Sequence, residues 1–360
     1  MPSPFRTLFV GVGHIARAVH MPAFRQLGDD FEVVGAVDVE PAAAKAFAEE
    51  FDLPHHSTDL EAALAATRPD LVVIASPPFA HRRQTVTALR AGAWVWCEKP
   101  PALSLAEYDA MTGAEGPGGP YAPIVFQQRF GSGAEHARDL IASGEFGPPL
   151  VAHCQTTWYR DDGYYSAPWR GRWETEGGGP TLNLGIHQTD LLLELLGPWV
   201  EVRAMAGRLA RPIATEDVST ALVRFASGAL ATVVNSALSP REVSHLRIDL
   251  RDVTIELDHV YGYANADWRY TPARGVDASR IPVPRDDVPS SHLAQLRSLL
   301  ADLRAGRRPR ASGADGRRSL EFVTALYKAA LTGRSVRAGE IVPGDPFYAA
   351  LHGGVPGWAS

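Results

Sequence analysis

The sequence has little cysteine, little net charge and no long apolar run, and each shortage argues against a class of protein. Only 2 of its 360 residues are cysteines, too few for a disulfide framework or a cysteine-rich zinc site. Lysine and arginine number 35 against 41 acidic residues, a formal net charge of −6, which does not favour nucleic-acid binding. The apolar runs fall far short of the ~20 residues of a membrane span, and the first residues lack the apolar core of a signal peptide. We therefore expect a cytoplasmic protein with no nucleic-acid or membrane partner.

The length predicts about two domains, and the apolar runs predict an α/β fold. In residues 1–125, short apolar runs alternate with helical stretches, which is typical of a doubly wound parallel sheet covered on both faces. This part is expected to be a dinucleotide-binding Rossmann domain. Its expected strands are Thr7–Val10, Phe31–Val37, Leu71–Ala75, Trp94–Cys97 and Ile124–Phe126.

The pattern changes in the second part of the chain. Apolar segments there are joined by short turns such as Ser227-Gly228, which favours an antiparallel sheet. The expected strands are Val218–Phe225, Ala229–Asn235, Leu246–Leu250 and Thr254–Asp258, and the expected closing helices are His292–Ala305 and Arg317–Thr332.

The first chemical signal is the turn Gly11-Val12-Gly13-His14-Ile15-Ala16, which follows a strand and opens a helix. Gly11 permits a tight turn, Gly13 lets a pyrophosphate approach the backbone, and Ala16 keeps helix and strand close. Asp38 ends the next strand, where a carboxylate accepts hydrogen bonds from a ribose. No lysine or arginine follows Asp38 within the next six residues, which favours NAD over NADP. A purely structural glycine turn is the alternative.

The second signal is Lys99 in Glu98-Lys99-Pro100, directly after the fourth expected strand. Ligands of open parallel sheets bind beyond the carboxyl ends of the strands, so a lysine there would face a nicotinamide ring. Pro100 fixes the turn that holds this lysine. An ordinary surface lysine in a strand-ending turn is the alternative.

The third signal is Asn183, His187 and Asp190, which follow the run Gly177-Gly178-Gly179. If one helix continues from this turn to Leu196, their spacing places all three on one face. A histidine beside a carboxylate can act as a general acid or base. A buried structural His–Asp pair is the alternative. A metal site formed by the three lacks a second histidine or a cysteine nearby.

These three signals, in this order, resemble the glucose–fructose oxidoreductase/inositol dehydrogenase (Gfo/Idh/MocA) family. The resemblance covers nearly the whole chain and is also carried by Ala75-Ser76-Pro77-Pro78 with His81, Phe126-Gln127-Gln128-Arg129-Phe130, Trp169-Arg170-Gly171 and Gly185-Ile186-His187. It implies that residues 126–345 form an α/β domain with a large, mostly antiparallel open sheet. That domain would bind substrate and mediate oligomerisation, and its terminal helices would pack back towards the Rossmann domain.

The resemblance also implies a role for each matching residue. Lys99 would be the active-site lysine and His187 the catalytic acid/base. Asn183, where many relatives have aspartate, would orient the substrate or His187, and Asp190 would complete the catalytic set. The cofactor would contact His14, Ile15, Ser76, Pro77, His81, Glu98, Lys99 and Gln127 besides the residues named above. The substrate would contact Lys99, Asn183, His187, Arg129 and, from the arginine-rich aromatic segment Trp158–Trp173, the residues Tyr159, Trp169 and Arg170.

The implied function is an NAD(P)-dependent dehydrogenase acting on CH–OH donors, with NAD preferred. Hydride would pass between nicotinamide and a hydroxyl-bearing carbon of a sugar, a sugar acid or a cyclitol. The family also implies a homodimer or a homotetramer, and no metal. A catalytically silent dinucleotide-binding regulator or sensor of the same fold is the alternative.

Overall fold

The computed structural model describes residues 3–358; Met1 and Pro2, with which the first expected domain begins, and residues 359–360 lie outside the described residues. The chain divides into two units. Unit 1 comprises residues 3–102, Ala106–Val125 and Gln295–Arg317, and unit 2 comprises Leu103–Leu105, Phe126–Ala294 and residues 318–358. Within residues 3–358, no helix is both long enough and apolar enough to cross a membrane.

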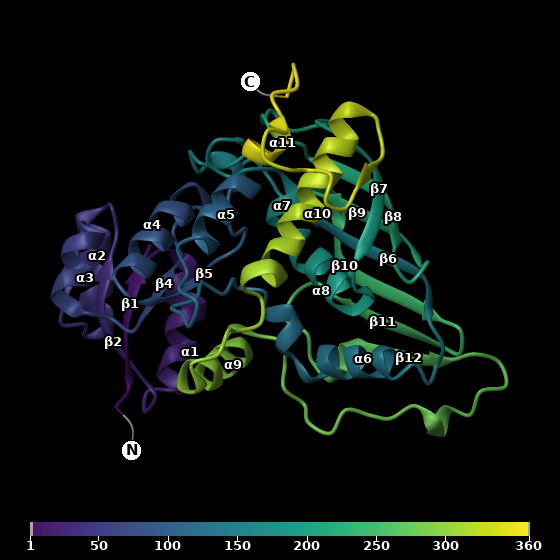
Figure 1. The fold of residues 1–360 in the computed structure, drawn as a ribbon, viewed down its shortest axis with the longest axis horizontal. Helices are drawn as coiled ribbons and strands as arrows, with labels where there is room; N and C mark the ends of the chain where they lie inside the picture. The colour runs from purple at the N-terminus through teal and green to yellow at the C-terminus, as the bar shows by residue number, and fades with distance from the viewer. Residues whose placement is uncertain (1–2, 359–360) are drawn as a thin grey trace. The chain divides into compact units, whose positions relative to one another are not determined.

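Unit 1 is built on a five-stranded parallel sheet (Figure 1). The strand order β3-β2-β1-β4-β5 places the first strand in the middle, so the direction in which successive strands are added to the sheet reverses between β1 and β4, although all strands run parallel. Parallel sheets of this order bind ligands at that reversal, beyond the carboxyl ends of the strands. This confirms the predicted doubly wound fold class. The strands are β1 (Phe5–Val10), β2 (Phe31–Val37), β3 (His56–Ser57), β4 (Leu71–Ile74) and β5 (Trp94–Cys97).

Local signals set the limits of most helices in unit 1. Proline occupies the first turn of α2 and of α4, where its missing N–H costs no hydrogen bond. Asp59 caps α3 by accepting a hydrogen bond from the N–H of Ala62. The helices that lie wholly or mainly in unit 1 include α2 (Pro41–Phe51), α3 (Leu60–Thr67), α4 (Pro78–Arg90), α5 (Leu105–Thr112) and α9 (His292–Ala305).

The predicted helix after the glycine turn is confirmed, as a π-helical segment η1 (Ala16–His20) followed by the short α1 (Met21–Gln26). One expectation for unit 1 was wrong. The expected strand Ile124–Phe126 forms only one isolated bridge, between Ile124 and Cys97. An apolar run alone does not distinguish a strand from a buried extended segment.

Unit 2 is built on an eight-stranded sheet of order β12-β11-β10-β6-β9-β8-β7-β13 (Figure 1). All neighbours are antiparallel except β6 and β9, which run parallel. The large, mostly antiparallel sheet is therefore confirmed. The strands are β6 (Pro149–Tyr159), β7 (Trp199–Gly207), β8 (Val218–Phe225), β9 (Leu230–Ser236), β10 (Leu238–Leu250), β11 (Val253–His259), β12 (Trp268–Pro272) and β13 (Val336–Arg337).

Helices cover one face of this sheet. The helix α8 packs against β6 and β10, and the shorter α7 packs against β8 and β9. Alternate residues of β8 are buried and exposed, which is typical of a strand with one covered and one open face. The helical segments that lie wholly or mainly in unit 2 are η2 (Gln127–Phe130), α6 (Ser132–Ser143), η3 (Tyr164–Ser166), α7 (Pro180–Asn183), α8 (Ile186–Leu196), η4 (Asn265–Asp267), η5 (Ala278–Arg280), α10 (Gly313–Thr332) and α11 (Pro346–Ala349).

The prediction of a single helix from the glycine run to Leu196 was wrong, because the helix is interrupted between α7, which ends at Asn183, and α8, which begins at Ile186. Gly185 lies at this break. A Cβ on Gly185 would lie 1.9 Å from Oδ1 of Asn235 on β9, so any larger residue at this position would require the buried Asn235 side chain to move. The helical-wheel argument for a common polar face therefore does not hold for Asn183, which belongs to α7.

Candidate active site

The glycine turn after β1 has the geometry of a dinucleotide cradle. Gly11 has a φ of +81°, and a Cβ there would lie 2.4 Å from the backbone nitrogen of Ser76. Gly13 and His14 are exposed, and apart from Val12 and His14 no described residue has an atom within 4 Å of the position of a Cβ on Gly13. Ala16 is fully buried. The turn therefore packs tightly against the end of β4 and leaves an open backbone edge, which fits the approach of a pyrophosphate.

Asp38 lies beside this turn, at the end of β2. Its Oδ2 accepts a hydrogen bond from the N–H of Val12, and its Oδ1 accepts one from the N–H of Glu40, both at 3.0 Å. Because a carboxylate offers about four acceptor positions, this half-buried side chain can still bind ribose hydroxyls. Ile15, also half-buried, precedes η1. The first group of predicted cofactor residues is thus gathered at the carboxyl ends of β1 and β2.

His81 links the turns that follow β4 and β5. Its ring is fully buried, with Nε2 2.8 Å from the carbonyl oxygen of Ser76 and Nδ1 2.9 Å from that of Pro100. Burial lowers the pKa of His81, and the two carbonyls oppose that change. The hydroxyl of Ser76 donates to Gln84 at 2.5 Å, and Pro77 precedes α4. The contacts therefore fix the shape of both turns; direct cofactor contacts stay a prediction.

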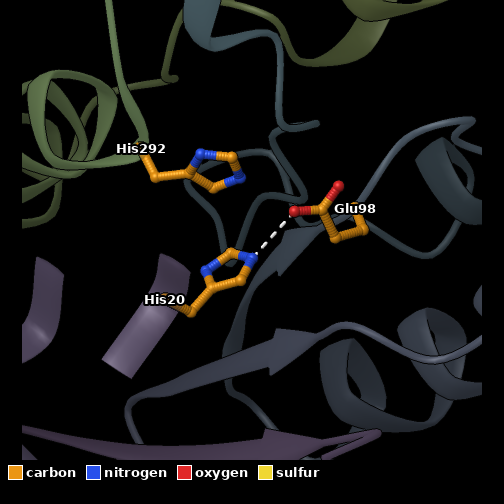
Figure 2. Close-up of side chains that lie close together, drawn as sticks. All are labelled: His20, Glu98 and His292. Atoms are coloured by element: carbon orange, nitrogen blue, oxygen red, sulfur yellow. Dashed lines mark hydrogen bonds and ion pairs between the residues drawn. The ribbon is translucent and has the colours of Figure 1, made fainter. Parts of the chain in front are cut away.

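Glu98 anchors the lysine turn after β5. Its Oε1 lies 2.8 Å from Nε2 of His20 on η1 (Figure 2). Its Oε2 accepts a hydrogen bond from the N–H of Lys99 at 3.1 Å. Glu98 is buried, Lys99 is half-buried, and the Lys99–Pro100 peptide bond is cis. Sequence reasoning missed His20, because it lies 78 positions from Glu98 and only the sheet topology brings the two together.

Asn183 and His187 lie on either side of the break between α7 and α8. The Asn183 amide donates to the carbonyl oxygens of Gly178 and, at 3.4 Å, of Gly179, so its side chain fastens α7 to the glycine run. His187 lies in the first turn of α8 and is 5% exposed. The centre of its ring lies 5.6 Å from that of Tyr261. The two predicted residues are therefore held by different backbone segments.

Asp190 forms a buried ion pair with Arg129 on η2. Its two oxygens accept hydrogen bonds from Nε, at 2.6 Å, and Nη2 of Arg129, and the Ser319 hydroxyl donates to it at 2.6 Å. Glu194 lies 3.3 Å from the same guanidinium. Breaking such a pair usually costs about 3–5 kcal/mol, so it holds α8 against η2. Because the Arg129 guanidinium is hydrogen-bonded to both oxygens of Asp190, this pairing argues against a metal site formed by Asn183, His187 and Asp190.

Gln127, on the same short helix as Arg129, is also buried. Its Nε2 donates a hydrogen bond to the hydroxyl of Tyr261. Among the described residues no donor reaches its buried Oε1. An unmatched buried acceptor costs about 1–3 kcal/mol, which suits a residue whose partner is a ligand.

The segment Trp158–Trp173 stacks arginine on aromatic rings. The guanidinium of Arg170 lies 3.8 Å from the ring centre of Tyr164 and 4.2 Å from that of Trp169, and it is paired with Glu176 at 2.9 Å. Tyr159 is 45% exposed. Flat aromatic faces and guanidinium groups are suited to sugar rings and their polar substituents. The expected substrate contacts of these residues stay a prediction.

Sequence reasoning also missed Glu216, which is fully buried beneath α7. Its carboxyl accepts hydrogen bonds from the N–H groups of Gly179 and Thr181 at 3.0 Å and from the Tyr327 hydroxyl at 2.9 Å. Burial raises the pKa of Glu216 to about 7, and the hydrogen bonds oppose this. The available signal was the adjacent acidic pair Glu216-Asp217 directly before an apolar strand.

Two family models match the chain. One, described as an oxidoreductase family with an NAD-binding Rossmann fold, covers residues 5–116, and the other, described as the GFO/IDH/MocA C-terminal domain, covers residues 134–256. The chain belongs to the Gfo/Idh/MocA oxidoreductase family. Its cofactor is NAD, which the glycine turn and Asp38 fit. The residues that carried the resemblance thus led to the correct family.

Known family members are similar over almost the full length. The D-glucoside 3-dehydrogenase of Escherichia coli is 26% identical over 356 residues, which is 93% of this chain and 97% of that protein. The D-apiose dehydrogenase of Paraburkholderia graminis is 28% identical over 355 residues, 92% of this chain and 89% of that one. The WlbA dehydrogenase of Bordetella pertussis, solved with NADH and UDP-GlcNAcA, is 28% identical with a TM-score of 0.83 and covers 93% of this chain and 98% of its own.

Proposed function

We propose that this oxidoreductase transfers hydride between NAD and a hydroxyl-bearing carbon of a sugar, a sugar acid or a cyclitol, with His187 and Lys99 acting on the substrate oxygen. The observation that carries the proposal is the buried His187 at the start of α8, in a chain that also holds a lysine on an anchored turn after β5. The names of the two dehydrogenase relatives support a sugar substrate.

The proposed chemistry follows from the protonation states of these two side chains. Neutral His187 takes the proton of the substrate hydroxyl, as a general base does. Cationic Lys99 donates a hydrogen bond to the same oxygen and stabilises its developing negative charge. NAD, when bound, supplies the hydride acceptor. In the reverse direction, imidazolium His187 returns the proton to the carbonyl oxygen.

Removing either side chain tests this assignment. With NAD and a panel of methyl glucoside, D-apiose, myo-inositol and UDP-GlcNAcA, we expect His187→Ala to lower kcat by roughly 10²–10⁴-fold. Lys99→Ala should also lower kcat, and the double variant should lose far less than the product of the single losses, since both groups act on one oxygen. NADH absorbance reports turnover, and calorimetry with NAD reports folding and cofactor binding.

Two results would contradict the proposal. Near wild-type turnover of His187→Ala on a verified substrate would make His187 a structural residue. Tight NAD binding with no turnover of any sugar, polyol or sugar acid would instead favour the regulator or sensor. The names of the two relatives reported above support the enzyme.

We further propose a homodimer, or a tetramer built from dimers, in the cytoplasm. The support for assembly is apolar surface on the open side of the sheet in unit 2, where Met205, Leu222 and Leu230 are 75%, 63% and 50% exposed. Contiguous exposed apolar side chains are typical of interfaces. The support for the compartment is the need for a diffusible nucleotide cofactor.

A further inference from the structure

Tyr261 contacts two of the predicted site residues, although no sequence signal pointed to it. It lies in the segment between β11 and η4. Its ring meets that of His187 edge to face at 5.6 Å and that of Trp158 at 6.1 Å, and its hydroxyl accepts the hydrogen bond from Gln127. These three neighbours come from α8, β6 and η2.

Hydrogen bonds through the Ser244 side chain hold the backbone at Val260, next to Tyr261. The indole N–H of Trp158 donates to the hydroxyl of Ser244 at 3.1 Å, and that hydroxyl donates to the carbonyl oxygen of Val260 at 2.8 Å. Trp158 is 9% exposed, whereas Tyr261 is 44% exposed. A large aromatic ring is thus held in place with nearly half of its surface accessible, directly beside the proposed acid/base.

We propose that Tyr261 is a further active-site residue with two tasks. Its ring gives the sugar a stacking face beside His187, because the C–H face of a sugar packs on an aromatic ring. Its hydroxyl accepts the hydrogen bond of the Gln127 amide and so fixes the orientation of Oε1, the atom that we propose a ligand binds. The assignment rests on the proposed catalytic role of His187.

Variants at position 261 separate the two tasks. Tyr261→Ala removes the ring, and we expect the KM of the sugar to rise about tenfold, with a matching loss of sugar affinity in calorimetry on the NADH-bound protein. Tyr261→Phe keeps the ring, so KM should stay unchanged while kcat falls about three- to tenfold through the lost hydrogen bond to Gln127. Tyr270→Phe is the matched control, since this tyrosine lies on the edge strand β12.

The outcomes distinguish failure of this inference from failure of the proposed function. Unchanged KM, kcat and sugar affinity in both Tyr261 variants, with turnover lost in His187→Ala, would overturn the role of Tyr261 alone. Unchanged turnover in His187→Ala, or no binding of any panel sugar, would overturn the proposed function on which it rests. If melting shows that Tyr261→Ala is unfolded, Tyr261→Leu keeps the bulk without the aromatic face and should show the same rise in KM.

Discussion

At the scale of the residue, the Asp38 carboxylate both fastens the glycine turn and is expected to bind the ribose of the cofactor. Its carboxylate already accepts the N–H groups of Val12 and Glu40, which hold the glycine turn against the end of β2. A ribose would use the remaining lone pairs. The same negative charge opposes a 2′-phosphate, because like charges at hydrogen-bond distance repel each other. Cofactor choice therefore depends on one side chain whose orientation the backbone fixes.

We predict that NAD binds at least roughly tenfold more tightly than NADP, which corresponds to about 1.4 kcal/mol. Asp38→Asn keeps an oxygen for Val12 but removes the charge, so the ratio of the two affinities should shrink. Calorimetric titration with both cofactors measures this ratio. Asp59→Asn, which alters the exposed cap of α3, is the control and should leave the ratio unchanged. Equal affinities in the wild-type protein would refute the argument.

At the scale of the element, α7 depends on a carboxyl group from outside the helix. Glu216 satisfies the N–H groups of Gly179 and Thr181 at the start of α7, which a four-residue helix cannot satisfy by itself. Asn183 ends the same helix. The position of Asn183 therefore depends on a residue more than thirty positions further along the chain.

The raised pKa of Glu216 predicts a pH-dependent stability. The folded pKa is about 7 against an ordinary 4.5, so between these values the folded state holds a proton that the unfolded state has lost. The contribution of Glu216 to the free energy of unfolding is fully present below about pH 4.5 and is lost as the pH rises through about 7. The free energy of unfolding changes by about 3 kcal/mol over this range. In the Glu216→Gln variant the amide side chain does not titrate, so this loss of stability with rising pH should be absent.

Urea unfolding of both proteins at several pH values checks this prediction. The free energy of unfolding of the wild-type protein, minus that of Glu216→Gln, should fall between pH 4.5 and 7.5. Glu174→Gln, at an exposed glutamate of the same unit, should follow the wild-type curve. Parallel curves for the wild-type protein and Glu216→Gln would show that Glu216 does not change its protonation on unfolding in this range.

At the scale of the whole molecule, the sheet of unit 2 has unequal faces. The helices α7 and α8 cover one side. On the strands β8 and β9, Leu222 and Leu230 are directed away from the core, and Val151 of β6 pairs in register with Leu230. Burying such a face against a second copy would remove several apolar side chains from water at about 25 cal/mol per Å².

We predict that light scattering will give two or four times the monomer mass. Leu222→Glu places a charge in the middle of the apolar face and should shift the protein towards monomer, because an unpaired buried charge is costly. Val283→Glu, at a valine that is 80% exposed outside the strands, is the control and should not change the mass. A monomer at micromolar concentration in the wild-type protein would contradict the proposed assembly.

Features that depend only on neighbouring residues could be predicted from the amino-acid sequence. Runs such as Phe31–Val37 and Trp94–Cys97 correspond residue for residue to β2 and β5, because a buried parallel strand needs only a continuous apolar run. The glycine turn was recognisable because its geometry requires glycine at fixed positions. The order of these signals along the chain was enough to recognise the family.

Contacts between side chains from distant parts of the chain are set by the three-dimensional fold. Gly185 before α8 lies against the Asn235 side chain of β9, Glu98 of the lysine turn is paired with His20, and Asp190 is paired with Arg129. Tyr261 is brought to His187 by the path of β11. A periodic pattern reports which face of an element is buried, but the partner on that face is set by strand order and packing. Such contacts join residues far apart in the chain, and no local pattern encodes them.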